Sequence, residues 1–544
     1  MGPLLTLTNR PVTAMLLIAG SVTPGKATPS SIRVLRRADD LLERAAPLIA
    51  VALLVLFALW GWLASKATRL QFDELLELSA ATASTAAGVV SSLASGVDYN
   101  PPLSHFLVRA FHGWFGDAEW ALRLPAFLGF AVMLVSLYFF VAKQLGRTYG
   151  AIAMLFILCL PVRQYAIQVR PYGMVLGFSG LCVLLFDTAL HRRTRLFALA
   201  GLALCTGALT ATHYYGVLVV GVLCAAALVR SWEVRRFDWP LLISCTAAPL
   251  LVLILLHNVI AQQKHELAHY FARGNLLSFD HGYDDFAMDP LVYCVALVPG
   301  IVLLFLRART GEPRMSVPPV PGIQPAVMAL SLGLLVLPLA GAVITQLITH
   351  AYLARYFLPA ALGLAICACC VLRSVAGALP GLALVAVLSL SMGFGKAILQ
   401  ETHHSPDALP SASVLQSAAT PVLFDTPEAY LQVYHYLPSV RRNIWAIADP
   451  AASLHYRRYD TDDRIMLALA GQGKAQAVSL AAAARMWPAF RLVPRSADYV
   501  WALKCVMDSG ARIAVRRPFG ASNFIFEVNV PPESIPFIEA CGQQ

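Results

Sequence analysis

Three carboxylates precede one short amphipathic segment of the chain. Asp73 and Glu74 occur in the stretch FDELLEL, and Asp98 opens the stretch DYNPPL. A carboxylate can take the proton of a hydroxyl as that hydroxyl attacks, which makes a weak nucleophile reactive. A single acidic residue in a loop is usually solvated, but three before one segment are candidate catalytic residues. Asp73 and Asp98 would also be the ligands if a divalent metal ion takes part.

Basic and aromatic side chains gather in three other short stretches. RQYAIQVRPYGM contains Arg170 and Tyr172, THYYG contains His213 and Tyr214, and HAYLARYFLP contains Arg355. Fixed positive charge stabilises a phosphate, most strongly where water is excluded. Carboxylates from one loop and cations from the others would suit a bound phosphate beside a group that needs a base.

The composition of the chain predicts that these charged and aromatic residues are held by the helices of a membrane protein. Hydrophobic residues make up 58% of the chain and charged residues 13%, whereas about 25% charged residues is usual in soluble proteins. Apolar runs long enough to cross about 30 Å of hydrocarbon recur along the chain. The net charge is +10, but no basic stripe interleaves with stacking aromatic residues, so no binding to nucleic acid is expected.

The apolar runs predict about eleven membrane spans and their orientation. Lys and Arg concentrate in alternate loops, for example at Arg192, Arg193 and Arg195, and loops of this kind face the cytoplasm. The N-terminus should therefore be cytoplasmic, and the region after the last span should lie on the outer face of the inner (plasma) membrane. The spans are expected at about 46–64, 120–141, 150–166, 172–190, 197–211, 214–229, 240–261, 289–306, 325–348, 356–372 and 377–397.

This topology divides the chain into three parts. Residues 1–45 are expected to form a loose cytoplasmic tail, and residues 46–399 a transmembrane domain whose first outer loop is 65–119. Residues 400–544 should form a small α/β domain on the outer face. Its two cysteines, Cys505 and Cys541, are the only ones outside the predicted spans, and an oxidising compartment would favour a disulfide between them.

Propensity and turn signals support an α/β fold for the last part. Alternating apolar residues predict strands, and Thr426 followed by a proline predicts a helix start. The expected elements are strands at 420–425 and 443–448, helices at 426–437 and 475–487, and a hairpin at 511–530 around Gly520.

A short helix is predicted in the first outer loop, after Asp98. Apolar residues from Leu103 to Trp114 follow a helical spacing, and Pro101 and Pro102 favour a helix start. The segment is too short to span a bilayer, so its apolar stripe is expected to lie in the membrane interface. The opposite side carries polar residues, namely Ser104, His105, Arg109 and His112.

The same stretches resemble bacterial members of glycosyltransferase family 39. These GT-C enzymes are related to dolichyl-phosphate-mannose protein mannosyltransferases and to the lipid A aminoarabinose transferase. The resemblance covers about residues 45–400 and is most specific over 98–126. It rests on the order FDELLEL, DYNPPLSHFLVRAFHGWFGDAEWALRLPAFLGF, YAIQVRPYGMVL, THYYGVLVV and RYFLPA. It implies an all-α polytopic GT-C fold with interfacial helices in the first outer loop.

The resemblance also implies an activity. Such enzymes transfer a sugar, a hexose or a pentose, from a polyprenyl-phosphate donor to a hydroxyl of a cell-envelope acceptor, which could be lipopolysaccharide, another glycolipid, a polysaccharide or a protein. Asp73 is implied to be the base, or to organise a metal or the acceptor, and Asp98 matches the aspartate before the proline pair. Family members often have His or Lys where this chain has Asn100. Phosphate binding would then shift to the residues Arg170, His213 or Arg355.

The candidate residues favour a single displacement with inversion, because one carboxylate would act as base while cations hold the phosphate. A retaining double displacement needs a second carboxylate as nucleophile, for which Glu74 or Asp98 is available. The main alternative function is a polytopic secondary transporter or a flippase of lipid-linked sugars. Many transporters are built from related halves, and the sequence shows no internal repeat.

Overall fold

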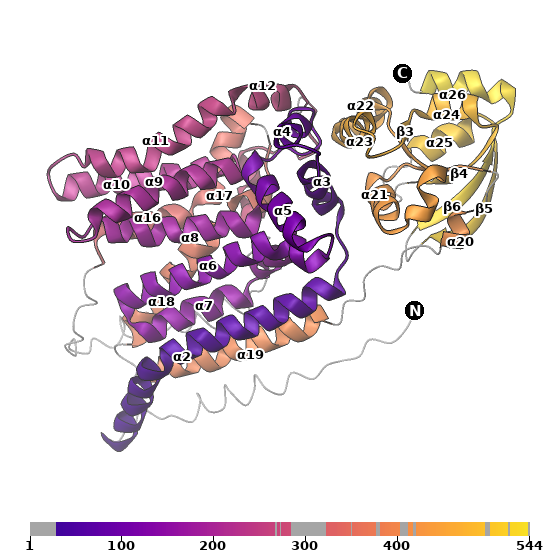
Figure 1. Cartoon of the computed structure of the whole chain (residues 1–544). Helices are drawn as coiled ribbons and strands as arrows, with labels where there is room; N and C mark the ends of the chain where they lie inside the picture. The colour runs from indigo at the N-terminus through magenta and orange to yellow at the C-terminus, as the bar shows by residue number, and fades with distance from the viewer. Residues whose placement is uncertain are drawn as a thin grey trace.

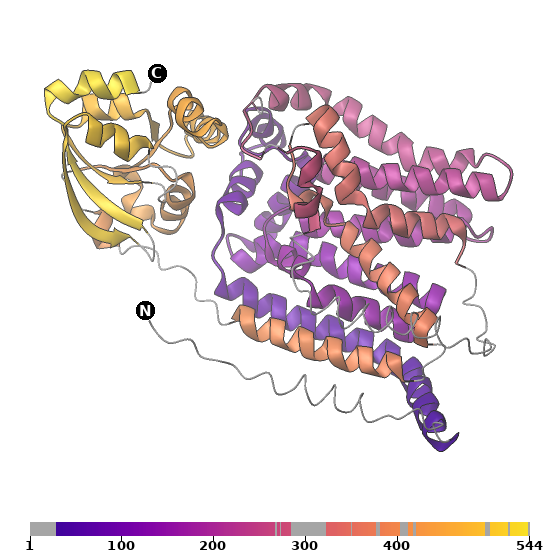
Figure 2. The same ribbon diagram turned by 180° about the vertical axis from the view of Figure 1, so that it is seen from behind.

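The computed structural model of the protein describes residues 29–266, 269–272, 274–283, 323–349, 351–376, 381–402, 412–416, 420–494, 501–519 and 523–541. These residues form a body of long helices and, at one end of it, a small α/β domain (Figures 1 and 2). The predicted fold class, a helical membrane protein with a small sheet-containing C-terminal domain, is thereby confirmed.

Apolar helices occupy all the predicted spans that fall within the described residues. Six single helices there are long and apolar enough to cross a membrane: α2 (Pro29–Ala67), α6 (Glu119–Leu145), α8 (Tyr172–Ala189), α9 (Arg195–Thr212), α10 (Gly216–Glu233) and α19 (Leu382–Thr402). Three more are bent pairs: α7 (Arg147–Cys159) with η1 (Pro161–Ile167), α11 (Trp239–Leu255) with α12 (His257–Glu266), and α16 (Pro325–Leu335) with α17 (Leu337–Ile344). Helix α18 (Ala360–Ala376) is shorter. The predicted span 289–306 lies outside the described residues, so the total of eleven stays a prediction.

Two helices differ from the prediction. Helix α2 begins at Pro29, so residues 29–45 extend the first span instead of belonging to a loose tail; residues 1–28 lie outside the described part. The third predicted span, 150–166, bends by 78° between α7 and η1. Leu160, at the break, is extended with φ −80° and ψ 151°, because a residue that precedes a proline disfavours the helical conformation.

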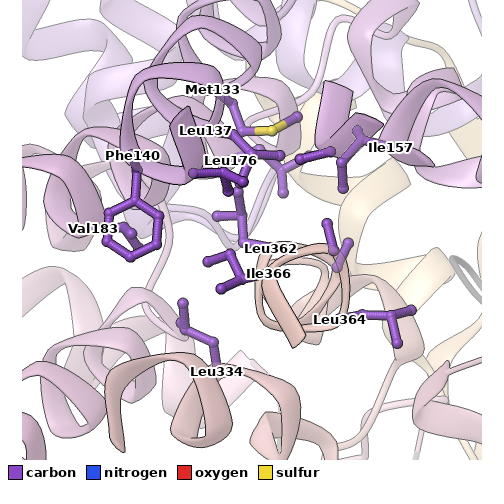
Figure 3. Close-up of a cluster of buried hydrophobic side chains, with 14 of the residues drawn as sticks. Met133, Leu137, Phe140, Ile157, Leu176, Val183, Leu334, Leu362, Leu364 and Ile366 are labelled. Atoms are coloured by element: carbon purple, nitrogen blue, oxygen red, sulfur yellow. The ribbon is translucent and has the colours of Figure 1, made fainter. Parts of the chain in front are cut away.

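The core of the helical body lies between α6, α7, α8, α16 and α18 (Figure 3). Its side chains are aliphatic or aromatic and fully or nearly fully buried, as close packing of membrane helices requires. They include Met133, Leu137 and Phe140 of α6, Ile157 of α7, Leu176 and Val183 of α8, Leu334 of α16, and Leu362, Leu364 and Ile366 of α18.

Helix α8 packs against α6 with almost no space between the two backbones. A Cβ atom at Gly173 would lie 2.2 Å from the carbonyl oxygen of Ala126, and one at Gly177 would lie 2.4 Å from that of Gly129. Small residues at a four-residue spacing allow membrane helices to approach this closely. The contact fixes the start of α8, which carries Tyr172.

The first outer loop folds into three short helices, α3 (Phe72–Ala81), α4 (Ala86–Ala94) and α5 (Pro102–Phe115). The helix predicted from Leu103 to Trp114 is thus confirmed as α5. Its polar face is not turned to solvent, however, because Ser104 and His105 are completely buried, whereas Trp114 is 70% exposed. The apolar end of α5 remains available to a membrane interface, and its buried polar residues face the protein.

The C-terminal domain contains, in its described part, a sheet with the order β3-β2-β1-β4-β6-β5. The first four strands in this order are parallel, β6 pairs antiparallel with β4, and β5 pairs antiparallel with β6. The strands are β1 (Val422–Phe424), β2 (Ile444–Ile447), β3 (Ala477–Val478), β4 (Ala489–Val493), β5 (Arg512–Phe519) and β6 (Asn523–Asn529). The helices of eight or more residues are α21 (Pro427–Tyr436), α22 (Pro450–Arg457), α23 (Thr461–Gly471) and α25 (Trp501–Asp508), and the two shorter ones used below are α24 (Leu480–Met486) and α26 (Ile535–Cys541).

Most elements predicted for this domain are present. The two strands, the first helix and the hairpin are confirmed, although Gly520 lies outside the described residues. The helix predicted over 475–487 is wrong in its first part, which forms β3. Ser479 ends that strand and begins α24, since its hydroxyl accepts a hydrogen bond from the N–H of Ala482 at 3.2 Å.

A disulfide joins Cys505 of α25 to Cys541 of α26, with 6.2 Å between their Cα atoms. The predicted pairing is therefore confirmed. The bond ties the last helix to the domain across 36 residues of sequence, which restricts the unfolded chain.

The C-terminal domain packs on the first outer loop. Helix α21 contacts α3 (Figure 1), and apolar residues of both, such as Leu75 and Tyr430, belong to one buried cluster. The hydroxyl of Tyr436 accepts a hydrogen bond from the N–H of Leu70 at 2.7 Å. Helix α3, which carries Asp73, is therefore held between the helical body and the C-terminal domain.

Candidate active site

The start of α3 fixes two adjacent carboxylates in different surroundings. Glu74 is 2% exposed and reaches back to accept a hydrogen bond from the N–H of Gln71 at 2.9 Å, which is a capping-box contact. Its other oxygen accepts from the N–H of Val169 at 2.7 Å and from Nε of Arg123 at 3.2 Å. Asp73 lies one residue earlier and points elsewhere, with 32% of its side chain exposed.

Arg123 completes this buried anchor. It is 1% exposed, and besides Glu74 it donates hydrogen bonds to the carbonyl oxygens of Ser65 at 2.8 Å and Thr68 at 3.0 Å. The guanidinium thus joins α6 to the end of α2 and the start of α3. Glu74, predicted as a candidate catalytic residue, is used in this contact and is closed to solvent.

Asp73 faces a cation. Its Oδ2 lies 3.0 Å from Nη1 of Arg355, whose side chain is 27% exposed. The ring of Tyr172 lies below both Arg355 and Arg170, at 6.0 and 5.8 Å from the two guanidinium carbons. Two arginines, one aromatic ring and one partly open carboxylate therefore form the accessible part of the site.

Arg170 connects the two predicted aspartates. Its Nη1 donates to Oδ2 of Asp98 at 3.0 Å and to the backbone carbonyl of Asp73 at 2.9 Å. The other oxygen of Asp98 accepts from the side-chain amide and backbone N–H of Asn100, at 2.8 and 3.1 Å. Burial raises the pKa of Asp98, but Arg170, His105 and the Asn100 N–H outweigh it and hold that pKa well below its usual range.

Glu77 and His105 extend this group inward, and neither is among the site residues predicted from the sequence. Both side chains are fully buried, and Nε2 of His105 lies 3.7 Å from Glu77 and 3.6 Å from Asp98. Burial raises the pKa of Glu77. The sequence did contain a pattern that could have identified Glu77. It follows Asp73 by four residues, and residues at that spacing share one face of a helix.

The predicted metal ligands are not paired as expected. Glu77, Asp98 and His105 are the group of three potential ligands that lie within 4.8 Å of one another in the described part of the chain. Asp73 is not a member of it, and its carboxylate contacts Arg355 instead.

His213 and Tyr214 lie at the turn between α9 and α10. The His213 ring is 5.6 Å from the ring of Tyr172 and 5.2 Å from that of Tyr356. Burial, assisted by the charge of Arg170, lowers the pKa of His213 to about 3, so its imidazole is neutral. Nδ1 accepts from the N–H of Tyr215 at 3.1 Å, which places the proton on Nε2.

Tyr214 is connected to Asp98 through the side chain of Gln263. Its hydroxyl donates to Oε1 of Gln263 at 2.9 Å, and the amide of Gln263 donates to the carbonyl of Asp98 at 3.2 Å. Tyr270 also belongs here, because its hydroxyl is 3.0 Å from that of Tyr356. Of the predicted residues, Asp73, Asp98, Arg170, Tyr172, His213 and Arg355 form one group, Tyr214 borders it, and Glu74 lies behind it.

Comparison with solved structures shows which proteins have this architecture. The chain is similar to the crystal structure of ArnT from Cupriavidus metallidurans in the apo state, with a TM-score of 0.54 and 14% identity over 88% of this chain and 97% of the other. It is equally similar to ArnT from the same organism bound to undecaprenyl phosphate, with a TM-score of 0.54 and 13% identity over 89% and 98%. Because the sequence identity is low, this similarity establishes that the chain shares the ArnT fold and does not by itself establish a shared activity.

Sequence comparison adds a family. Residues 99–260, which run from the DYNPPL stretch to α12, match the family model described as dolichyl-phosphate-mannose-protein mannosyltransferase. Among curated protein sequences there is no match.

The chain has the fold of ArnT, and its residues 99–260 match a mannosyltransferase family model; both findings agree with the GT-C type that the sequence resembles. The resemblance that the sequence indicates is confirmed: residues 99–260 are similar to the dolichyl-phosphate-mannose-protein mannosyltransferases, and the chain shares the fold of ArnT. The predicted GT-C fold is confirmed with it.

Proposed function

We propose that this glycosyltransferase transfers a sugar from a polyprenyl-phosphate donor to a hydroxyl of a cell-envelope acceptor on the outer face of the inner membrane. The observation that carries the proposal is the partly exposed carboxylate of Asp73 beside the guanidinium of Arg355. A base and a phosphate-binding cation are the two groups that such a transfer requires. The similar ArnT structure that contains undecaprenyl phosphate supports a polyprenyl-phosphate donor.

Asp73 is the proposed general base. It is the most exposed of the four carboxylates of the site, since Glu74, Glu77 and Asp98 are at most 4% exposed. In the absence of donor its charge is balanced by Arg355 at 3.0 Å. A donor phosphate would compete for Arg355 and release Asp73, so the base would become free only once the donor is bound.

Arg355 and Arg170 are the proposed phosphate-binding cations. In the described part of the chain Arg355 contacts Asp73 and the ring of Tyr172, and its Nε has no hydrogen-bond partner there. Arg170 donates hydrogen bonds to Asp98 and to the backbone carbonyl of Asp73, so it is less free than Arg355 to turn toward a phosphate. His213 is neutral and would contribute a hydrogen bond from Nε2 rather than a charge.

The surroundings of the carboxylates support a single displacement with inversion. A retaining mechanism requires a second carboxylate that can attack the sugar. Both candidates for that role are engaged elsewhere, Glu74 with Arg123 and Asp98 with Arg170 and Asn100. Asp73 is left as the one carboxylate in the described site with substantial exposure.

A transfer assay in proteoliposomes tests the function. Purified full-length protein is supplied with a radiolabelled polyprenyl-phosphate sugar and with cell-envelope extract, and labelled product is separated from donor. Appearance of a labelled glycan, lipid or protein supports the proposal. Movement of intact donor between leaflets without transfer would instead support the flippase alternative.

Substitution of Arg355 by Ala is expected to weaken use of the donor. One charge-assisted contact contributes roughly 1.5–3 kcal/mol, so the donor KM should rise about 10- to 100-fold, with little change in the acceptor KM. Steady-state kinetics with each substrate in turn measures both values. Arg442→Ala, at an exposed position of the C-terminal domain, is the matched control, and equal donor KM values in the two variants would refute the assignment.

The orientation is proposed from the distribution of Lys and Arg. Alkaline phosphatase, which is active only after export, should be active when fused after residue 416 and inactive when fused in the loop at 192–194. A reporter that fluoresces only in the cytoplasm should show the opposite result. Cytoplasmic fluorescence of the C-terminal fusion would place the site on the wrong side for this donor.

A further inference from the structure

We propose that Glu77, Asp98 and His105 form a binding site for a divalent transition-metal ion. The site deepens the proposed function, and its role in transfer rests on that function, whereas its existence as a metal site can be tested separately. Three residues from three elements meet here: Glu77 from α3, Asp98 from the segment before the proline pair, and His105 from α5.

The distances between these side chains are those of ligands and not those of hydrogen-bonded groups. Nε2 of His105 is 3.7 Å from an oxygen of Glu77 and 3.6 Å from one of Asp98, whereas N–H···O bonds measure about 2.7–3.2 Å. Ligand atoms at about 2.0–2.2 Å from a tetrahedral ion lie ~3.4 Å from one another. A small ion would fit between the three groups with minor adjustment.

The orientation of the His105 ring also favours a ligand. Nδ1 lies 3.3 Å from the carbonyl oxygen of Pro101 and 3.3 Å from the hydroxyl of Ser104. A histidine that binds a metal commonly donates its other N–H to a backbone carbonyl in this way. With the proton on Nδ1, Nε2 would be free to bind an ion that the two carboxylates also contact.

The burial of these side chains also favours a bound ion. The side chains of Glu77 and His105 are both 0% exposed, and neither oxygen of Glu77 nor Nε2 of His105 has a hydrogen-bond partner among the described residues. Buried ionisable groups without partners are costly. Arg170 contacts Asp98 directly at 3.0 Å, so Glu77 is the carboxyl group whose charged form a bound ion would stabilise.

The types of ligand atom determine which kind of metal ion would bind. Carboxylate oxygens alone would suit Mg²⁺ or Ca²⁺, but an imidazole nitrogen favours ions such as Zn²⁺ or Mn²⁺. Three protein ligands leave a coordination position for a further group, as in catalytic zinc sites. Bound there, the ion would supply positive charge beside Arg170, on the phosphate-binding side of the site.

Metal content and spectroscopy test the site without any substrate. Full-length protein in nanodiscs is stripped with a chelator and titrated with Zn²⁺, and bound zinc is measured by mass spectrometry. We expect about one ion per chain in the wild type and an affinity at least ~10-fold weaker in Glu77→Gln. Asp73→Asn should keep the wild-type zinc stoichiometry even though it is expected to lose transfer activity, which separates the metal site from the proposed function.

Two outcomes would overturn the site: no zinc bound by the stripped wild type, or the same affinity in wild type and Glu77→Gln. If the Gln variant does not fold, Co²⁺ added to the stripped wild type provides a measurement that needs no variant. Ligation by His105 and two carboxylates should produce visible absorption bands that Zn²⁺ abolishes by competition. Absence of such bands at saturating Co²⁺ would likewise overturn the proposal.

Discussion

An Asp73→Asn variant is expected to transfer sugar at least about 100-fold more slowly than the wild type. Asn keeps the size of the side chain and can still contact Arg355, but it cannot accept the proton of the acceptor hydroxyl. General-base assistance contributes about 100- to 10,000-fold to a rate, which sets the expected range. The measurement is kcat in a purified assay at saturating donor and acceptor.

The fold should tolerate this change. The Asp73 side chain is 32% exposed at the start of α3, and a polar replacement at such a position rarely unfolds a protein. Yield and unfolding temperature should therefore stay near the wild-type values. Asp117→Asn is the matched control, because the Asp117 side chain belongs to the same outer loop and is 82% exposed. If Asp73→Asn keeps most of its activity, the base is another group, and Asp98 becomes the next candidate.

An Arg123→Met variant should lose about 3–5 kcal/mol of stability, the usual effect of removing one member of a buried ion pair. The change leaves Glu74 closed to solvent without its cation, and it removes the hydrogen bonds to Ser65 and Thr68. Since these contacts hold the start of α3, donor-dependent activity should fall together with stability. The measurement is thermal unfolding in detergent, followed by tryptophan fluorescence.

The double variant Arg123→Met with Glu74→Gln separates charge from packing. Removing both charges leaves no unpaired ion in the interior, so part of the lost stability should return. If the double variant is no more stable than Arg123→Met alone, the effect lies in the lost backbone contacts and not in the charge of Glu74.

Four of the site residues proposed from the sequence lie together in the structure. Asp73, Arg170, Tyr172 and Arg355 each stand at the end of an apolar run, where a membrane protein can expose charge at the surface. The position of Tyr172, at the start of α8, depends on the close approach of α6 and α8 that the glycines at 173 and 177 permit.

The buried part was harder to predict. His105 follows a helical pattern that assigns it to the polar and therefore outer side of α5, yet in the structure it is completely buried. Burial of a polar face becomes favourable only when another element supplies groups for it, here Glu77 and Asp98. Periodicity within one helix contains no information on that second element. For the same reason, Ala477 and Val478 of β3, which precede an Ala-rich helix, are predicted as part of that helix until their pairing with β2 is known.

The buried cluster shared by α3 and α21 has a consequence for how such enzymes can diversify. Because Leu75 and Tyr430 belong to one core, the first outer loop and the C-terminal domain cannot be exchanged separately between relatives without leaving unmatched apolar surface. A chimera that moves only the C-terminal domain should express poorly, whereas one that moves both segments together should express well. The two segments, although more than three hundred residues apart, would then be inherited and engineered as one module.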